Sequence, residues 1–234
     1  MTSLLSVFLQ ASAGVPAGQL PAVPAQEDTL SLLDLIAKGG FLMIPIGLLS
    51  LISIYVLVER LLAIRKAAAF NHQLLDQTRE NLLRGNLDAA SSLCKGNGTP
   101  AGLMLAKGIS RIGNSTRDIE SAMEGVGKLE LGRLEKNIGI LGVIAGIAPM
   151  FGFIGTIAGV IKIFYNISLA DNISIGLISG GLYEKMITSA AGLVVGVFSF
   201  VSYHYLTMAI DKLSLRMEAQ AMGFMDILNE KPKA

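Results

Sequence analysis

The stretch Ile138–Ile161, IGILGVIAGIAPMFGFIGTIAGVI, decides the fold of this chain. It holds 24 residues without a single charged side chain. As a helix it would be roughly 36 Å long, since each residue adds 1.5 Å, and the hydrocarbon core of a bilayer is about 30 Å thick. The stretch is therefore predicted to cross a membrane as a helix, within the segment 138–163.

A 3.6-residue period divides this helix into two different faces. One face carries the only hydroxyl of the span, on a threonine. The other face, about a quarter-turn away, consists of glycine and alanine, which let helix backbones approach closely in lipid. We predict that the small face is buried in helix packing within an assembly built around a polar pathway. The first face is Gly142, Gly146, Pro149, Phe153, Thr156 and Val160, and the small face is Ala145, Ala148, Gly152, Gly155 and Gly159.

The threonine of the first face has two interpretations from spacing alone. Thr156 could line the pathway, where its hydroxyl would contact water or an ion. Alternatively, its hydroxyl could bond to the carbonyl of Gly152 one turn back, as threonine in lipid commonly does.

Composition supports a membrane protein. The chain has 234 residues, of which 52% are hydrophobic and 16% are charged, against about 25% charged residues in average soluble domains. The net charge of +1 and the lack of a zinc-finger or phosphate-loop pattern exclude the usual nucleic-acid and nucleotide binders. The single cysteine, Cys94, cannot form an intrachain disulfide, and we expect a dispensable free thiol. We expect no metal, no cofactor and no covalent chemistry.

Two further segments are long and apolar enough to cross a membrane. Segment 39–62 contains 18 uncharged residues from Phe41 to Val58. Segment 178–207 has a Glu and a Lys near its start, followed by 25 residues without Asp, Glu, Lys or Arg. Gly192 and Gly196 form a GxxxG pair within it, a second packing motif. The predicted fold is all-α, with three transmembrane helices and a helical polar domain.

The remaining segments precede, connect or follow these helices. We expect residues 1–28 to be an irregular extension, the alternative being a weak signal peptide with a cleavage site at Ala11-Ser12-Ala13. Thr99-Pro100 and Ser115 are predicted helix starts, and the helix from Ser115 has no clear breaker before Gly139, so it is expected to run into the second span. The other expected segments are an amphipathic interfacial helix at 29–38, which could alternatively be the first turns of the first span, a helical domain at 63–137, a loop at 164–177 and a tail at 208–234.

Lysine and arginine placement predicts the orientation. Twelve of the nineteen lie between Arg60 and Lys136, and four more follow Ile210. Positively charged segments stay preferentially in the cytoplasm. We therefore expect a cytoplasmic helical domain and C-terminus, and a periplasmic N-terminus and 164–177 loop.

Glu184 is the one acidic residue expected inside the bilayer. It lies six residues after Ile178, about 9 Å along the helix. A carboxylate there is costly unless it faces protein, water or a cation, which makes it a functional candidate; the alternative places it at headgroup level. Thr188 lies one turn along on the same face, and Ser189 about 100° further round.

Two motifs carry a family resemblance. Residues 148–157, APMFGFIGTI, resemble the APLLGLLGTV signature of the MotA/TolQ/ExbB proton-channel family. Residues 181–193, GLYEKMITSAAGL, resemble the family's third-span pattern G-I-A-E-A-L-x-T-T-A-x-G-L. The first span, with its ERLL exit, resembles the ExbB and TolQ branch, and three spans rather than four favour that branch over MotA.

The resemblance implies a mechanism and partners. In this family five copies surround a pore lined by the second and third spans, and the pore holds the single membrane helices of an ExbD-, TolR- or MotB-like protein whose aspartate carries the proton. It implies an inner-membrane subunit that couples the proton gradient to work at the cell envelope, with a TonB- or TolA-like protein as a further partner. Glu184 matches the family glutamate, Thr188 and Ser189 match its paired threonines, and Thr156 matches the second-span threonine.

Two departures from the family pattern affect these expectations. Ser189 keeps the hydroxyl of a threonine but lacks its methyl group. Lys185 replaces a small apolar residue, and it could extend to the lipid headgroups or bind Glu184 of a neighbouring copy. The alternative function is a structural membrane assembly that conducts nothing, which the scarcity of ionisable groups in the spans supports.

Overall fold

The computed structural model describes residues 40–69, 73–169 and 175–229, all within one compact unit, Ile36–Ala234. The segments expected at 1–28 and 29–38 lie outside the described residues. The described part is helical without β-strands, and three of its helices are long and apolar enough to cross a membrane, which confirms the predicted fold class. The helices are α3 (Met43–Ala67), α4 (Gln73–Leu83), α5 (Leu87–Gly96), α6 (Pro100–Ile109), α7 (Thr116–Glu135), α8 (Ile138–Leu169) and α9 (Ile175–Asn229).

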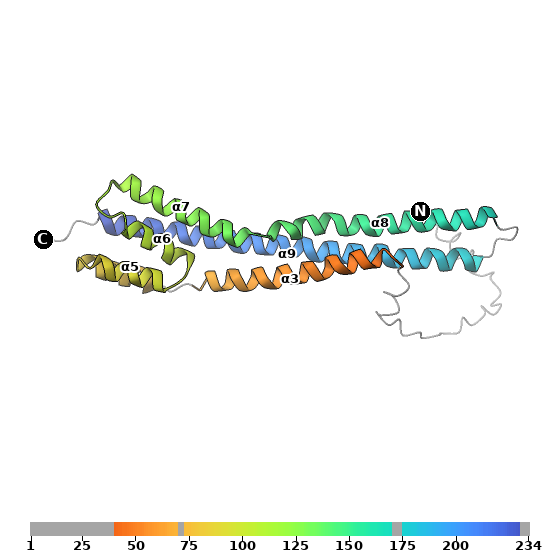
Figure 1. Ribbon diagram of the computed structural model, residues 1–234, viewed down its shortest axis with the longest axis horizontal. Helices are drawn as coiled ribbons and strands as arrows, with labels where there is room; N and C mark the ends of the chain where they lie inside the picture. The colour runs from red at the N-terminus through yellow and green to blue at the C-terminus, as the bar shows by residue number, and fades with distance from the viewer. Residues whose placement is uncertain (1–39, 70–72, 170–174, 230–234) are drawn as a thin grey trace, which may run out of the picture. The chain divides into compact units, whose positions relative to one another are not determined.

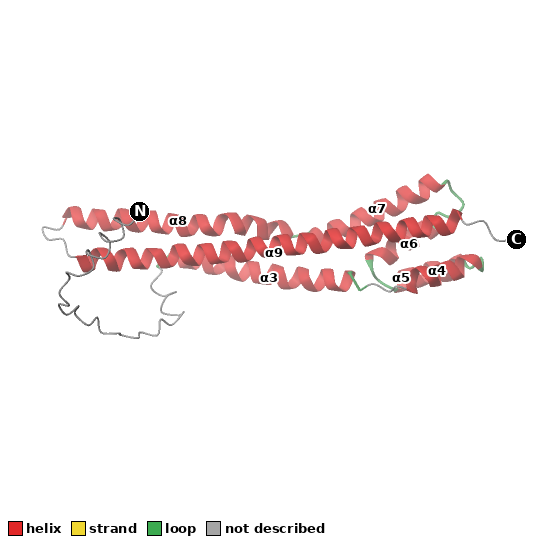
Figure 2. Ribbon diagram, turned by 180° about the vertical axis from the view of Figure 1, so that it is seen from behind, coloured by secondary structure: helices red, strands yellow, loops and turns green. Residues whose placement is uncertain are grey.

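The three long apolar helices α3, α8 and α9 lie side by side (Figure 1). The α8–α9 contact is the most extensive of the described helix pairs, and α3 packs against both partners. Helices α4 to α7 gather along the C-terminal part of α9, as the view from behind also shows (Figure 2). One helix, α9, therefore contributes to both the apolar bundle and the polar domain.

The helices extend beyond the ends of the predicted spans. Helix α8 continues to Leu169, and α9 begins at Ile175, so much of the expected 164–177 loop is helical. Helix α9 also continues through the expected tail as far as Asn229. The end of an apolar run does not have to coincide with the end of a helix. Helix α8 continues past its apolar run because neither Gly nor Pro follows Phe164 before the end of the helix.

The junction of α7 and α8 corrects one expectation. An uninterrupted helix was expected there, but α7 ends at Glu135 and α8 begins at Ile138. Asn137 adopts a left-handed backbone conformation, with φ of 66°. Asparagine tolerates this conformation better than most residues, so it can break a helix without Gly or Pro.

Side chains cap the short helices as the sequence predicts. The Thr99 hydroxyl accepts a hydrogen bond from the Gly102 amide at 3.2 Å, and Pro100 opens α6. The Ser115 hydroxyl accepts one from the Asp118 amide at 3.2 Å at the start of α7. These bonds satisfy amides that lack a partner inside the helix, and both predicted helix starts are confirmed.

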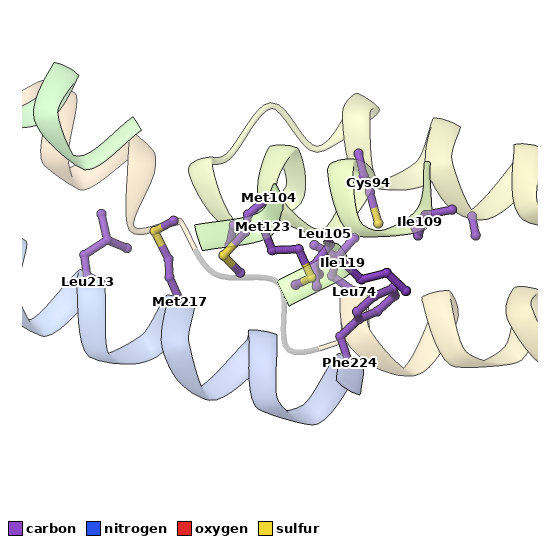
Figure 3. Packing of buried hydrophobic residues seen from close by; sticks show 13 residues of the cluster. Leu74, Cys94, Met104, Leu105, Ile109, Ile119, Met123, Leu213, Met217 and Phe224 are labelled. Atoms are coloured by element: carbon purple, nitrogen blue, oxygen red, sulfur yellow. The ribbon is translucent and has the colours of Figure 1, made fainter. Parts of the chain in front are cut away.

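The core of the polar domain forms around the C-terminal part of α9. Figure 3 shows Met217 and Phe224 of α9 beside methionine and leucine side chains of the shorter helices. Gly108 provides the space for this packing, because a β-carbon there would lie 2.5 Å from the Met123 sulfur and 2.9 Å from a ring carbon of Phe224. Apolar burial of this kind is the main stabilising term for a soluble domain, so the short helices depend on α9.

Cys94 is a fully buried free thiol in this core. Its sulfur lies 3.3 Å from the Thr78 hydroxyl, which also donates to the Leu74 carbonyl at 2.6 Å. Burial raises the pKa of the Cys94 thiol, and the Thr78 hydrogen bond partly opposes that rise. The thiol is therefore protonated and shielded at neutral pH, unlike a reactive cysteine.

We predict that Cys94→Ser leaves assembly and activity intact and lowers stability by about 1 kcal/mol, a typical cost for one substitution. The serine hydroxyl is close in shape and keeps Thr78 as a hydrogen-bond partner. Maleimide labelling of the wild-type protein should be slow when folded and fast in denaturant. Loss of activity in a folded, assembled variant would show that the thiol has a redox or partner role.

Candidate functional site

The small face of α8 packs against α9 of the same chain. A β-carbon added at Gly192 would lie 2.5 Å from the Ala148 carbonyl oxygen and 3.1 Å from the Gly152 α-carbon. A β-carbon at Gly152 would lie 3.0 Å from the Ser189 backbone. The two backbones are thus in direct contact, which only glycine allows. We call this contact the glycine seam; its residues are Ala145, Ala148, Gly152, Gly155, Gly159, Gly192 and Gly196.

The seam has a regular antiparallel register. Gly196 faces Pro149 and the Ala145 carbonyl. In the other direction, Gly155 faces the Thr188 methyl group, at 3.0 Å from its β-carbon position. Each turn forward on α8 corresponds to one turn backward on α9, so the register of every side chain between the two helices is fixed.

The two predicted hydroxyl positions differ in environment. Thr188 is buried, with 1% of its surface exposed, because it packs onto Gly155 in the seam. Thr156 is partly exposed, about 100° round α8 from Gly155. The structure brings Thr188 and Ser189 to the α8–α9 contact and leaves Thr156 beside it.

The Thr156 hydroxyl donates to the Phe153 carbonyl at 2.7 Å. The expected alternative named the Gly152 carbonyl, one residue further back, as the acceptor. A hydroxyl that donates one hydrogen bond still has lone pairs that accept others. The exposed Phe153 lies on the same face of α8, so this face is apolar apart from Thr156.

The Glu184–Lys185 pair lies near the start of α9. Glu184 belongs to the helix, and its side chain lies outside the described part of the structure. Lys185 lays its aliphatic stem across α8 at Gly159, where a β-carbon would lie 2.0 Å from the Lys185 γ-carbon. The absence of a side chain at Gly159 makes the room for this lysine.

A hydrogen bond between two serines joins α3 to α9, and sequence reasoning missed it. The hydroxyls of Ser53 and Ser199 are 2.8 Å apart, and both side chains are fully buried. Such a bond satisfies two polar groups that would otherwise be unpaired in an apolar bundle. The sequence signal for this bond would have been a serine in each of two predicted spans, at a similar distance from the C-terminal end of each span.

Arg60 has a structural role beyond marking the end of the first span. Its side chain is buried and donates to the Arg133 carbonyl in the last turn of α7 at 3.3 Å. It also pairs with Glu59 at 2.5 Å. A cation at a helix C-terminus interacts favourably with the helix dipole, so Arg60 ties α3 to α7 just before the break at Asn137.

The fold and site define a multi-pass membrane protein whose second and third spans join through a glycine seam. In the part of the chain that the structure describes, no group of His, Cys, Asp and Glu could hold a metal. The model of the MotA/TolQ/ExbB proton channel family matches residues 97–219, more than half of the chain. The chain belongs to this family.

Curated relatives agree with the ExbB/TolQ branch. A putative biopolymer transport protein ExbB homolog from Methanothermobacter thermautotrophicus is 26% identical over 77% of this chain and 64% of its own length. The biopolymer transport protein ExbB of Neisseria gonorrhoeae is 28% identical over 42% of this chain and 46% of its own. The Tol-Pal system protein TolQ of Haemophilus influenzae is 26% identical over 43% of this chain and 41% of its own length. The chain spans less than two thirds of each of these relatives.

We predict that Gly192→Ala destabilises the protein by about 1–3 kcal/mol, as overpacking does, because its methyl group would meet the Ala148 carbonyl. The matched control is Gly146→Ala, since nothing lies within 4 Å of its β-carbon position. The control should be neutral or slightly stabilising, because alanine favours a helix. Thermal unfolding of the purified variants measures both, and equal destabilisation would contradict the seam.

We also predict that Ser53 and Ser199 are coupled. Ser53→Ala leaves the Ser199 hydroxyl without its partner, so a double-mutant cycle should give about 0.6 kcal/mol of coupling, the average for such bonds in a membrane protein. Ser202 is the control, because its hydroxyl donates to the Phe198 carbonyl of its own helix at 2.7 Å. Additive effects of Ser53→Ala and Ser199→Ala in the unfolding free energy would argue against the bond.

Proposed function

We propose that this chain is the ExbB/TolQ-like subunit of a proton-driven motor in the bacterial inner membrane. The motor would couple the proton gradient to outer-membrane transport or to envelope maintenance. Family membership supports the proton-driven role. The observation that carries the proposal is that the glycine seam occupies the small face of α8 and leaves Thr156 on a partly exposed apolar face.

The exposed faces of the bundle suit an assembly. Large apolar side chains beside Thr156 are exposed, among them Phe153 at 63% and Ile157 at 45%. The seam within one chain occupies the small face of α8, and the side chains exposed beside Thr156 are large and apolar, so we propose that these side chains make the contacts with other chains. We propose a ring of five copies, by analogy with the family, in which the Thr156 face lines the pore.

The pore would hold an ExbD/TolR-like partner with one membrane helix and an aspartate. A proton must pass from water to that aspartate through an apolar wall. The Thr156 hydroxyl donates to the Phe153 carbonyl at 2.7 Å, and its lone pairs can accept from a second group. If the hydroxyl rotates away from that carbonyl, it can accept from one group and donate to another without becoming charged. Burial of Thr188 in the seam gives it less access to such a path, so we assign Thr188 and Ser189 to the wall behind Thr156.

Orientation and envelope partners complete the proposal. The distribution of Lys and Arg supports a cytoplasmic α4–α7 domain and C-terminus and a periplasmic α8–α9 connection. A TonB- or TolA-like protein would transmit the motion of the partner helices to the envelope. The chain itself would perform no covalent chemistry.

We predict that Thr156→Val lowers proton flux through the reconstituted complex by about 100-fold, at the lower end of what a positioned proton-transfer group contributes. Valine keeps the shape and removes the hydroxyl. Thr156→Ser is the matched control and should retain flux, because it keeps the hydroxyl. Flux is measured in liposomes with the ExbD/TolR-like protein, beside the size of the purified complex. Full flux in Thr156→Val would overturn the pore-lining role, and an intact complex without flux in the wild type would favour the non-conducting scaffold.

The variant Glu184→Gln distinguishes between two roles for the Glu184 carboxylate, in the ion path or in an ion pair between neighbouring copies. If Glu184 serves the ion path, the variant should lose flux and keep its oligomeric size, because glutamine cannot carry the charge. If Glu184 binds Lys185 of a neighbouring copy, the variant should dissociate, and Lys185→Met should dissociate too. Mass photometry of both variants in detergent distinguishes these results. Unchanged size with unchanged flux would exclude both roles.

A further inference from the structure

We infer that a groove in the polar domain, between α7 and α9, binds a basic amphipathic helix, and that this helix is the cytoplasmic flank of the single-span partner. The inference rests on the proposed function, because that proposal supplies the partner. The groove encloses about 660 Å³. Methionines form its floor and carboxylates lie along its edges, and none of its lining residues belongs to the glycine seam or to the Thr156 face.

The floor of the groove is apolar. Met104 of α6, Met123 of α7 and Met217 of α9 lie close together there (Figure 3). A β-carbon at Gly127 would lie 3.6 Å from the Met104 sulfur and 3.7 Å from the Met217 methyl carbon, so the glycine leaves the floor open. Met222, which is 66% exposed, lines the α9 side. Methionine adapts to apolar side chains of different shapes and is common at surfaces that bind amphipathic helices.

The edges of the groove carry a net negative charge. Glu120 and Glu124 line it from α7 and Glu218 from α9, and all three are exposed. Lys128 is the one cation among the described lining residues, and it pairs with Glu124 at 2.6 Å. The Glu218 carboxylate accepts a hydrogen bond from Ser214 at 3.3 Å, which does not change its charge. Three carboxylates against one ammonium group favour a partner with Lys or Arg beside its apolar face.

The length of the groove suits about three turns of helix. On α9 the lining residues run from Ser214 to Asp226, a distance of about 18 Å at 1.5 Å per residue. Asp226 also lines a second cavity together with Arg79, so it is left out of the charge balance. Three turns of an amphipathic helix present apolar side chains on one face, which is how a helix binds in an apolar groove.

The position of the groove favours the single-span partner as its occupant. Ile210 belongs to the buried cluster of the apolar bundle, and Ser214 begins the groove one turn further along α9. A chain that leaves the bundle on this side therefore reaches the groove within a few residues. The cytoplasmic flank of a membrane helix is enriched in Lys and Arg, which complements the carboxylates. Helices α4 to α7 already place apolar side chains in their own domain core, so a segment of another protein fits better than a second copy.

The test is site-specific photo-cross-linking in the purified complex with the ExbD/TolR-like protein. The probe is p-benzoylphenylalanine in place of Met222, at the edge of the groove. The matched control has the same probe in place of Leu83, which is 63% exposed on α4 and does not line the groove. Mass spectrometry identifies the cross-linked peptides. The probe at position 222 should capture the partner's cytoplasmic segment, and the probe at position 83 should not.

Charge reversal tests the electrostatic complementarity. Glu120→Lys with Glu218→Lys should lower the cross-link yield about tenfold, because two attractive contacts become repulsive. Asp88→Lys, at an exposed carboxylate in the first turn of α5, is the control and should change nothing. Replacing the basic residues of the partner's segment by glutamate should restore the yield of the reversed variant.

Filling the floor provides a second variant. Gly127→Phe should lower the yield as well, because its ring would occupy the space above the methionines. Gly127→Ala should keep the yield, because its β-carbon makes only ordinary van der Waals contacts.

The inference is overturned if the probe at position 222 captures another copy of this chain, or captures nothing, while the partner stays in the complex. It is equally overturned if the charge-reversed variant, with unchanged thermal unfolding, keeps the wild-type yield. A wild-type chain that retains no single-span protein would overturn the proposed function together with this inference. A complex that cross-links as expected but conducts no protons would support the docking site and contradict the proposed function alone.

Discussion

The direct contact between the backbones of α8 and α9 is the constraint on which the rest of the structure depends. In lipid the hydrophobic effect does not drive helices together, so packing and hydrogen bonds must hold them. Gly152 and Gly192 let the two backbones touch, with a separation that one methyl group would disturb. This contact fixes the register, and the register places Thr188 at Gly155, Lys185 at Gly159 and the Tyr203 ring at Gly142.

The seam also determines which surfaces of the bundle pack within the chain and which remain exposed. The glycine seam packs one face of α8 on α9, the serine pair attaches α3, and many large apolar side chains of the bundle are left exposed. Helix α9 then continues without interruption into the core around Phe224. The bundle and the polar domain therefore share one helix, whereas Asn137 separates α7 from α8 and Arg60 ties α7 to α3.

Much of this arrangement could be predicted from the sequence, because lipid imposes simple rules. Length and lack of charge predicted three long apolar helices, and the period of small residues predicted which face of α8 would pack. Capping side chains at Thr99 and Ser115 identified two helix starts. Each of these features depends on residues that are close in the sequence, so it can be predicted from one segment of the chain.

The features that escaped prediction depend on pairs of distant residues or on weak local preferences. The Ser53–Ser199 bond joins residues 146 positions apart, and neither serine is unusual in its own helix. The helix breaks at Asn137 because asparagine adopts a left-handed conformation more readily than most residues. This preference is modest, and no Gly or Pro at the break makes it visible in the sequence. The extension of α9 to Asn229 depends on packing against helices that precede it in the chain. The sequence motifs predicted both Thr156 and Thr188 as pathway residues. Only the packing of α8 on α9 shows that Thr156 is partly exposed and Thr188 is buried.

Disulfide formation between residues 163 and 181 tests the α8–α9 register most directly. The γ-carbon of Ile163 lies 2.9 Å from the β-carbon position of Gly181, so a sulfur there would be within bonding reach of a second cysteine. In a Cys94→Ser background, Ile163→Cys with Gly181→Cys should give a cross-link within one chain, read as a shifted monomer band on a denaturing gel. Ile163→Cys with Leu182→Cys should not, because residue 182 lies about 100° round α9 from Gly181 and its side chain is exposed. A cross-link only between chains, or equal cross-linking of both pairs, would contradict the seam on which this account rests.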